Sequence, residues 1–78
     1  MAETNINARL KKFLSSALNE YQHKNYADAV RKLKQAFSID PQNPEILYNL
    51  GVTSCRLESY VEAIDYFRRL LELRSTSV

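Results

Sequence analysis

The sequence predicts an all-α fold made of amphipathic helices, and two observations lead to this prediction. First, the 78 residues contain a single glycine, whereas a β-rich fold needs many tight turns built from residues that tolerate positive φ. Second, apolar residues recur at steps of three and four along most of the chain, which is the spacing of one face of a helix. The length allows one domain.

The apolar residues fall into four blocks, and each block is interpreted as one helix. The predicted helices cover roughly 5–22, 26–39, 44–57 and 60–74. Thr4 or Asn5 can cap the first helix, because either side chain offers an oxygen to the free N–H groups of the first turn.

The breakers between the blocks place the three turns. The first turn is His23-Lys24-Asn25. The segment Asp-Pro-Gln-Asn-Pro over 40–44 ends the second helix and starts the third, with Pro44 in a first turn, where a helix accepts proline. Glu58-Ser59 forms the last turn.

The sequence repeats itself at a fixed offset. Ala29 aligns with Ala63, and Tyr26 aligns with Tyr60. The other aligned pairs are similar in character: Asp28 with Glu62, Val30 with Ile64, Leu33 with Phe67, Phe37 with Leu71, Ile39 with Leu73, Phe13 with Leu47, and Ala17 with Gly51. Two helical hairpins of the same design therefore stand in tandem.

The offset between the aligned pairs matches the helix-turn-helix period of the tetratricopeptide repeat (TPR), which is about 34 residues, and the residues resemble the consensus of that family. The resemblance is clearest over 46–51 (Ile-Leu-Tyr-Asn-Leu-Gly) and 59–67 (Ser-Tyr-Val-Glu-Ala-Ile-Asp-Tyr-Phe). It implies two tandem TPR hairpins with four antiparallel helices, a fragment of an α-solenoid. We expect residues 1–9 to be a lead-in that extends the first helix, 10–43 to be the first repeat, and 44–77 to be the second.

Small and large residues alternate where paired helices should cross. Ala17, Gly51, Ala29 and Ala63 allow close approach, and Phe13, Leu47, Leu33 and Phe67 fill the space beside them.

Three residues depart from the TPR pattern. Ser16 stands where the pattern has leucine and suggests a looser first repeat, and Ser75 stands where it has proline. Leu70 stands where the pattern has the alanine that admits a following repeat. We expect Leu70, Leu71 and Leu73 to form an apolar end patch, covered by another copy, a partner or further sequence.

Residues that could carry catalysis or hold a metal are sparse. His23 is the only histidine, and a solvated or turn-capping imidazole is expected there. Cys55 is the only cysteine, and we expect a buried or groove-lining thiol. A lone thiol fits a reducing compartment, so a cytoplasmic location is expected. We expect no enzyme activity, no cofactor and no metal.

Charge and hydropathy also restrict the partners. The formal net charge is +2, which is too small to indicate nucleic acid, and no stretch approaches the ~20 apolar residues that span a membrane. The charge is unevenly spread. Residues 1–39 hold seven basic and three acidic residues, a net of +4, whereas residues 40–78 hold four basic and six acidic, a net of −2.

The TPR resemblance implies a concave surface lined by the first helix of each repeat. By position, this surface would display Leu14, Leu18, Tyr21, Tyr48, Asn49, Val52 and Arg56. Several of these residues are apolar or aromatic side chains that the core of a hairpin does not require. Exposed apolar patches commonly mark interaction sites. Two interpretations stay open at this point: a groove for a peptide, or residues partly covered by neighbouring side chains.

Some TPR proteins bind the C-terminal carboxylate of Hsp70 or Hsp90 with a clamp of lysine and asparagine residues. In this sequence Leu14 and Leu18 occupy the clamp positions of the first helix, and only Asn49 matches. We do not expect this clamp.

Two functions follow from the resemblance. The first is an adaptor or scaffold module that binds a protein segment in its concave groove. The alternative is a structural unit that self-assembles through its repeat ends or its groove, because about three repeats are normally needed for a stable array. The opposite charges of the two halves favour head-to-tail contact, although two copies could also pack symmetrically. A homo-oligomer is expected.

Overall fold

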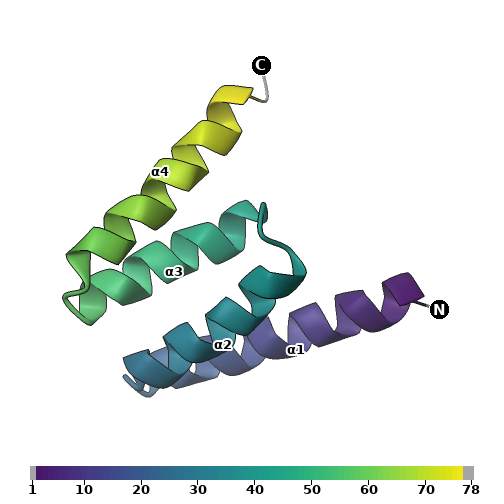
Figure 1. Cartoon of the computed structure of the whole chain (residues 1–78). Helices are drawn as coiled ribbons and strands as arrows, with labels where there is room; N and C mark the ends of the chain where they lie inside the picture. Colours follow the sequence, from purple (N-terminus) through teal and green to yellow (C-terminus); the bar gives the residue numbers. More distant parts are fainter. Residues whose placement is uncertain (1, 77–78) are drawn as a thin grey trace.

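The computed structural model describes the backbone of residues 2–76 and the side chains of residues 5–75. It contains four helices, α1 (Ala2–Gln22), α2 (Tyr26–Ile39), α3 (Pro44–Arg56) and α4 (Tyr60–Thr76), shown in Figure 1. Residues 2–76 contain no strand, and the predicted all-α fold is confirmed. Residue 77, the last of the predicted second repeat, lies outside this range.

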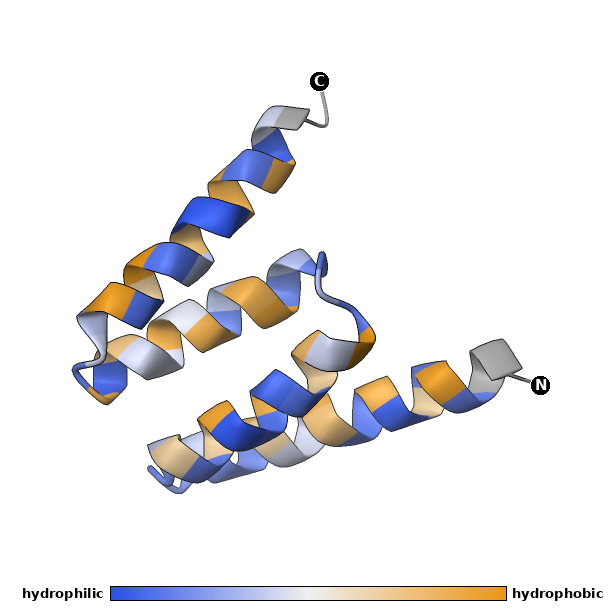
Figure 2. Cartoon of the chain, in the orientation of Figure 1, coloured by the Kyte–Doolittle hydropathy of each residue, from blue (hydrophilic) through white to orange (hydrophobic). Residues whose placement is uncertain are grey.

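The helices form two antiparallel hairpins, α1 with α2 and α3 with α4, and the second hairpin stacks on the first through α2 and α3 (Figure 1). The resulting molecule is flat, with extents of 39 × 37 × 15 Å. Apolar and polar segments alternate along all four helices (Figure 2), as expected for helices that each bury one face.

The predicted bounds hold for α2 and differ by one or two residues at the ends of α3 and α4. The observed start of α1 lies three residues before the predicted one, and the predicted cap is wrong. The helix begins at Ala2, so Thr4 and Asn5 lie inside it and do not cap it. No proline or glycine interrupts this segment, and the two hydroxyl and amide residues are tolerated within the first turns. As a result, the N-terminal part of α1 runs past the end of α2 (Figure 1).

The turns inside the two hairpins have the same backbone geometry. Lys24 and Glu58, one repeat apart, have φ values of 64° and 61°, in the left-handed region. After α1, the Asn25 N–H donates to the Glu20 carbonyl at 2.8 Å and the Lys24 N–H to that of Tyr21 at 2.9 Å. The same two bonds follow α3, at 2.8 and 2.9 Å. Each hairpin therefore turns through a Schellman motif, although neither has the usual glycine.

This geometry predicts that glycine stabilises both turns. We expect Glu58→Gly to raise the free energy of unfolding by about 0.5–1 kcal/mol, because glycine adopts positive φ without the steric cost that glutamate bears. Lys24→Gly should give a gain of similar size. Urea denaturation followed by circular dichroism measures both. Glu45→Gly, inside the first turn of α3, is the control and should destabilise; a loss of stability in Glu58→Gly would contradict the prediction.

The junction between the hairpins is capped by a side chain. The Asn43 side-chain oxygen accepts hydrogen bonds from the N–H groups of Glu45 at 2.9 Å and Ile46 at 3.3 Å, and Pro44 occupies the first turn. This cap satisfies two of the N–H groups that a helix start leaves free. The direction in which α3 leaves α2 is thereby fixed.

The core lies where the two hairpins meet. Ile46 and Leu50 of α3 are fully buried and pack with Ala17 of α1 and with Leu33 and Ala36 of α2. These residues belong to both predicted repeats, so the two hairpins share this cluster.

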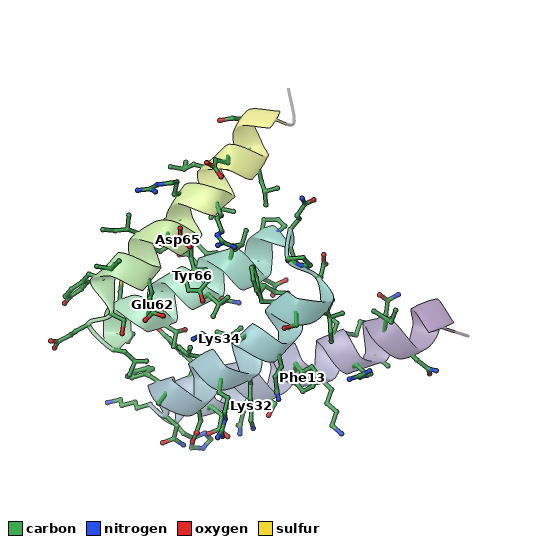
Figure 3. All side chains as sticks on the ribbon, in the orientation of Figure 1. Phe13, Lys32, Lys34, Glu62, Asp65 and Tyr66 are labelled. Atoms are coloured by element: carbon green, nitrogen blue, oxygen red, sulfur yellow. The ribbon has the colours of Figure 1, made fainter. Side chains whose placement is uncertain are left out.

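Contacts between α2 and α4 extend this interface. The rings of Phe37 and Tyr66 meet edge to face, with centroids 6.2 Å apart, and the Arg69 guanidinium lies 5.7 Å from the Phe37 ring centre. Figure 3 shows Lys34 on α2 and Tyr66 and Glu62 on α4; the Lys34 ammonium is 4.0 Å from the Glu62 carboxylate. Aromatic packing supplies most of this contact, because the exposed ion pair contributes little.

The second hairpin leaves no room for a side chain at Gly51. A Cβ placed on Gly51 would come within 2.6 Å of the Phe67 ring and clash with it. One repeat earlier, Ala17 and Leu33 take the places of Gly51 and Phe67, and both are buried. Each hairpin thus pairs a small residue with a larger one, and the larger ring requires the smaller partner.

Candidate functional site

A hollow of about 250 Å³ opens between the two hairpins. Its lining residues come from α1, α2 and α3: Ala17, Leu18, Tyr21, Leu33, Tyr48, Asn49, Val52 and Thr53. Five of the seven residues predicted for the groove are among them. Of the other two, Leu14 packs against the core, and Arg56 contacts the lining residue Tyr21.

Helix spacing explains why these side chains meet. Leu18 and Tyr21 are three residues apart on α1, and Tyr48 and Val52 are four apart on α3, so each pair shares one helix face. The buried Ala17 and Leu33 form the floor. Leu18 and Tyr48 stay 44% and 55% exposed, which leaves a large apolar surface open at the rim.

Aromatic contacts hold the two tyrosines of the hollow in place. The Tyr48 ring packs edge to face against Phe67, with centroids 6.3 Å apart, and Tyr21 packs against Tyr26 at 5.2 Å. Rings that are already ordered lose less entropy when a ligand binds. The hollow therefore has preformed aromatic walls.

A hydrogen bond joins the hairpins at one end of the hollow. The Arg56 Nε–H donates to the Tyr21 hydroxyl at 3.1 Å, although the two residues are 35 positions apart. This bond raises the pKa of Arg56 above its ordinary value, so the guanidinium is charged at every accessible pH. Arg56 is exposed and supplies one fixed positive charge beside the apolar walls.

The polar side chains of the hollow differ in whether they have hydrogen-bond partners. The Thr53 hydroxyl donates to the Asn49 carbonyl at 2.6 Å, which accounts for a buried hydroxyl. Within the described part of the chain, the Asn49 side-chain amide makes no hydrogen bond. Its donors and its acceptor are open to a ligand backbone.

Three lining residues escaped the sequence prediction. The sequence predicts that Ala17 and Leu33 lie where α1 and α2 cross, and they do lie there. The small side chain of Ala17 leaves space above the crossing, so both residues also form the floor of the hollow. Thr53 gave no signal, because a hydroxyl bonded to its own helix looks the same in the sequence as an exposed one.

Of the predictions for two residues outside the hollow, one is wrong and one is confirmed. The expectation of a buried or groove-lining Cys55 is wrong: the thiol is exposed and does not line the hollow, because it lies close to the end of α3, one turn beyond the lining residue Val52. The ring Nδ1 of His23 lies 2.8 Å from the Asn19 carbonyl, so the imidazole caps the end of α1, as predicted.

Ser16, where the TPR pattern has leucine, takes part in a polar cluster between α1 and α2. The Lys32 ammonium donates to the Ser16 hydroxyl at 2.6 Å and to the Glu20 carboxylate at 3.1 Å. Glu20 also accepts a hydrogen bond from the Asn25 side chain, and this bond, followed by that of Lys32, lowers the pKa of Glu20. The outer side of the first hairpin is therefore polar at this position.

The three leucines that were predicted to form an end patch do not lie on one surface of α4. Leu71 is 64% exposed, whereas Leu70 and Leu73 are half-buried. Leu73 lines a second, wider hollow on the other side of α4, together with Pro41, Gln42, Leu47, Arg69 and Glu72. Residues two apart on a helix point in nearly opposite directions, so Leu71 and Leu73 do not share a surface.

The described residues offer neither a metal site nor a membrane span. The described side chains, those of residues 5–75, include no group of three or more His, Cys, Asp and Glu residues placed to hold a metal ion. Over the same range, no helix combines the length and hydropathy that crossing a membrane requires.

Two stacked helical hairpins of the same design define a helical-repeat protein. Family models agree: one described as TPR repeat matches residues 17–54, and one described as tetratricopeptide repeat matches residues 44–77. The chain belongs to the tetratricopeptide repeat family, whose repeats are non-catalytic modules for protein–protein interaction. Among curated proteins, none matches the chain.

Proposed function

We propose that the chain is an interaction module that binds an extended segment of a partner protein in the hollow between its hairpins. The observation that carries the proposal is the meeting of Leu18, Tyr21, Tyr48 and Val52 around one opening. A volume of about 250 Å³ suits one or two side chains and falls below the size usual for cofactor and small-molecule sites.

The chemistry of the rim indicates which segment would fit. A large apolar side chain would enter between Leu18 and Tyr48, where burial and aromatic contact contribute most of the binding energy. The free amide of Asn49 would pair with the backbone of the segment. Arg56 would favour an acidic residue or a C-terminal carboxylate at the Tyr21 end, because its positive charge lies beside an otherwise uncharged lining.

A peptide selection tests the proposal. Random 12-residue peptides displayed on phage are selected on the immobilised wild-type chain. We expect enrichment of a large apolar residue with an acidic group a few positions away. Binding of a selected peptide is then measured by fluorescence anisotropy. Tyr48→Ala should weaken it at least about tenfold, and Leu18→Lys with Tyr48→Ala should abolish it.

The chain offers a matched control. Tyr60 is 58% exposed, close to the 55% of Tyr48, but does not line the hollow. Tyr60→Ala should leave peptide binding unchanged. Equal binding to the wild type and to the Leu18→Lys, Tyr48→Ala variant, or the absence of any enriched peptide, would count against the groove.

A further inference from the structure

The outer face of α4 carries a row of exposed apolar residues. Val61, Ile64 and Leu71 are 84%, 57% and 64% exposed, and with Arg68 they follow one another at steps of three, four and three. This spacing places all four on one face of the helix. We call this face the α4 stripe. An apolar row of this kind on a surface helix marks an interface.

The first repeat indicates what such a face is for. Val30 and Phe37 of α2 are the counterparts of Ile64 and Leu71, one repeat earlier. Both are half-buried, because they pack against the cluster that contains Ile46 and Leu50 of α3. The counterparts of Val61 and Arg68 are Ala27 and Lys34, and both stay exposed, so α3 covers part of this face of α2. All four residues of the α4 stripe are exposed.

A second copy cannot cover the stripe in the way that α3 covers α2. The residues of α1 that correspond to Ile46 and Leu50 are Lys12 and Ser16. Lys12 is exposed, and Ser16 accepts the hydrogen bond from Lys32. Placing α1 on the α4 stripe would bury an ammonium group and a polar cluster against valine and leucine, which is costly. Head-to-tail stacking, the arrangement that the net charges favour, is therefore disfavoured at the contact itself.

The α4 stripe is complementary to itself. If two stripes pack antiparallel about a two-fold axis near residue 66, Val61 of each copy faces Leu71 of the other, and Ile64 lies beside Arg68. By helix position, the acidic residues Asp65 and Glu72 flank the stripe, and Asp65 pairs with Arg69 of its own helix at 3.1 Å. Each Arg68 would then join the Asp65–Arg69 pair of the second copy, while its methylene groups cover apolar surface.

We propose that the α4 stripe is a two-fold interface through which two copies of this chain associate tail to tail. The groove residues lie on α1, α2 and α3, so this dimer leaves both hollows open and carries two binding sites. The contact is one helix wide, which places it among weak, reversible interfaces rather than obligate ones.

Sedimentation velocity over a range of protein concentrations tests the interface. The wild type should change from monomer to dimer as concentration rises. Ile64→Lys should raise the dissociation constant at least about 100-fold, because two-fold symmetry places the substitution in the contact twice. Ile6→Lys is the matched control, since Ile6 is also exposed, at 47%, and lies on α1 outside the stripe. Circular dichroism confirms that both variants keep their helices.

Cross-linking identifies the symmetry. In a Cys55→Ser background, Ile64→Cys supplies the only thiol. A short bismaleimide should join Ile64→Cys chains efficiently into dimers, because the two thiols lie near the axis. Addition of Lys12→Cys should produce no ladder of higher species. A wild type that stays monomeric at all concentrations, an Ile64→Lys variant that dimerises as the wild type does, or such a ladder would overturn the proposal.

Discussion

Leu50→Ala is expected to lower the free energy of unfolding by about 3 kcal/mol. Leu50 is fully buried at the junction of the two hairpins, and its loss removes apolar burial and leaves a cavity that the surrounding helices only partly fill. A chain of 78 residues has a total stability of about 4–12 kcal/mol, so this one truncation removes a large share of it. Urea denaturation followed by circular dichroism at 222 nm provides the measurement.

Leu18→Ala is the control, because it makes the same leucine-to-alanine change within a helix. Leu18 also lies within a helix but is 44% exposed, so the same truncation should cost less than about 1 kcal/mol. The Leu50→Ala transition should also move as a whole, because Leu50 packs against residues of both hairpins. If one hairpin unfolded while the other kept its original midpoint, the shared core would be refuted.

Gly51→Ala is the second large effect, and its sign depends on one neighbour. Alanine is the better helix former by about 1 kcal/mol, so propensity alone predicts stabilisation. A Cβ at this position would meet the Phe67 ring at 2.6 Å, and overpacking of this kind costs about 1–3 kcal/mol. The ring packs edge to face against Tyr48, so moving it aside would disturb that contact, and the cost of overpacking should exceed the gain in propensity. We expect Gly51→Ala to lower the free energy of unfolding.

The first hairpin indicates how to reverse this loss. It combines Ala17 with Leu33, which are the counterparts of Gly51 and Phe67. In a Phe67→Leu background, Gly51→Ala should therefore stabilise the chain by about 0.5–1 kcal/mol, because only the propensity gain is left. A double-mutant cycle built from thermal and urea unfolding measures the coupling. Equal effects of Gly51→Ala with Phe67 and with leucine at 67 would contradict the proposed clash.

Most of the fold follows from local sequence signals. The internal repeat, the proline pair around Asn43 and the three-and-four spacing predicted four helices within three residues of their observed ends. The start of α1 was missed because Thr4 and Asn5 are good caps but do not oblige a helix to begin. The positive φ of Lys24 and Glu58 had no signal at all, because neither residue type favours it.

The sequence indicated most of the residues that line the hollow, but not the shape of the hollow. Helix spacing identified the apolar residues on the first helix of each repeat, so Leu18, Tyr21, Tyr48 and Val52 were found. The depth of the hollow depends on how the hairpins stack, which no single helix encodes. Cys55 was misplaced for the same reason, since its exposure depends on how far along α3 the hollow extends.

The end-to-end arrangement of contacts has a mechanical consequence. The main contacts join each helix to the next one along the chain, α1 to α2, α2 to α3 and α3 to α4. A pulling force on the two ends of such a molecule meets no clamp of parallel bonds that must rupture together. We expect such a force to separate the helices one after another, at low force and over a long extension. A partner that joins α1 to α3 across the hollow would stiffen the molecule at the point where the two hairpins otherwise separate.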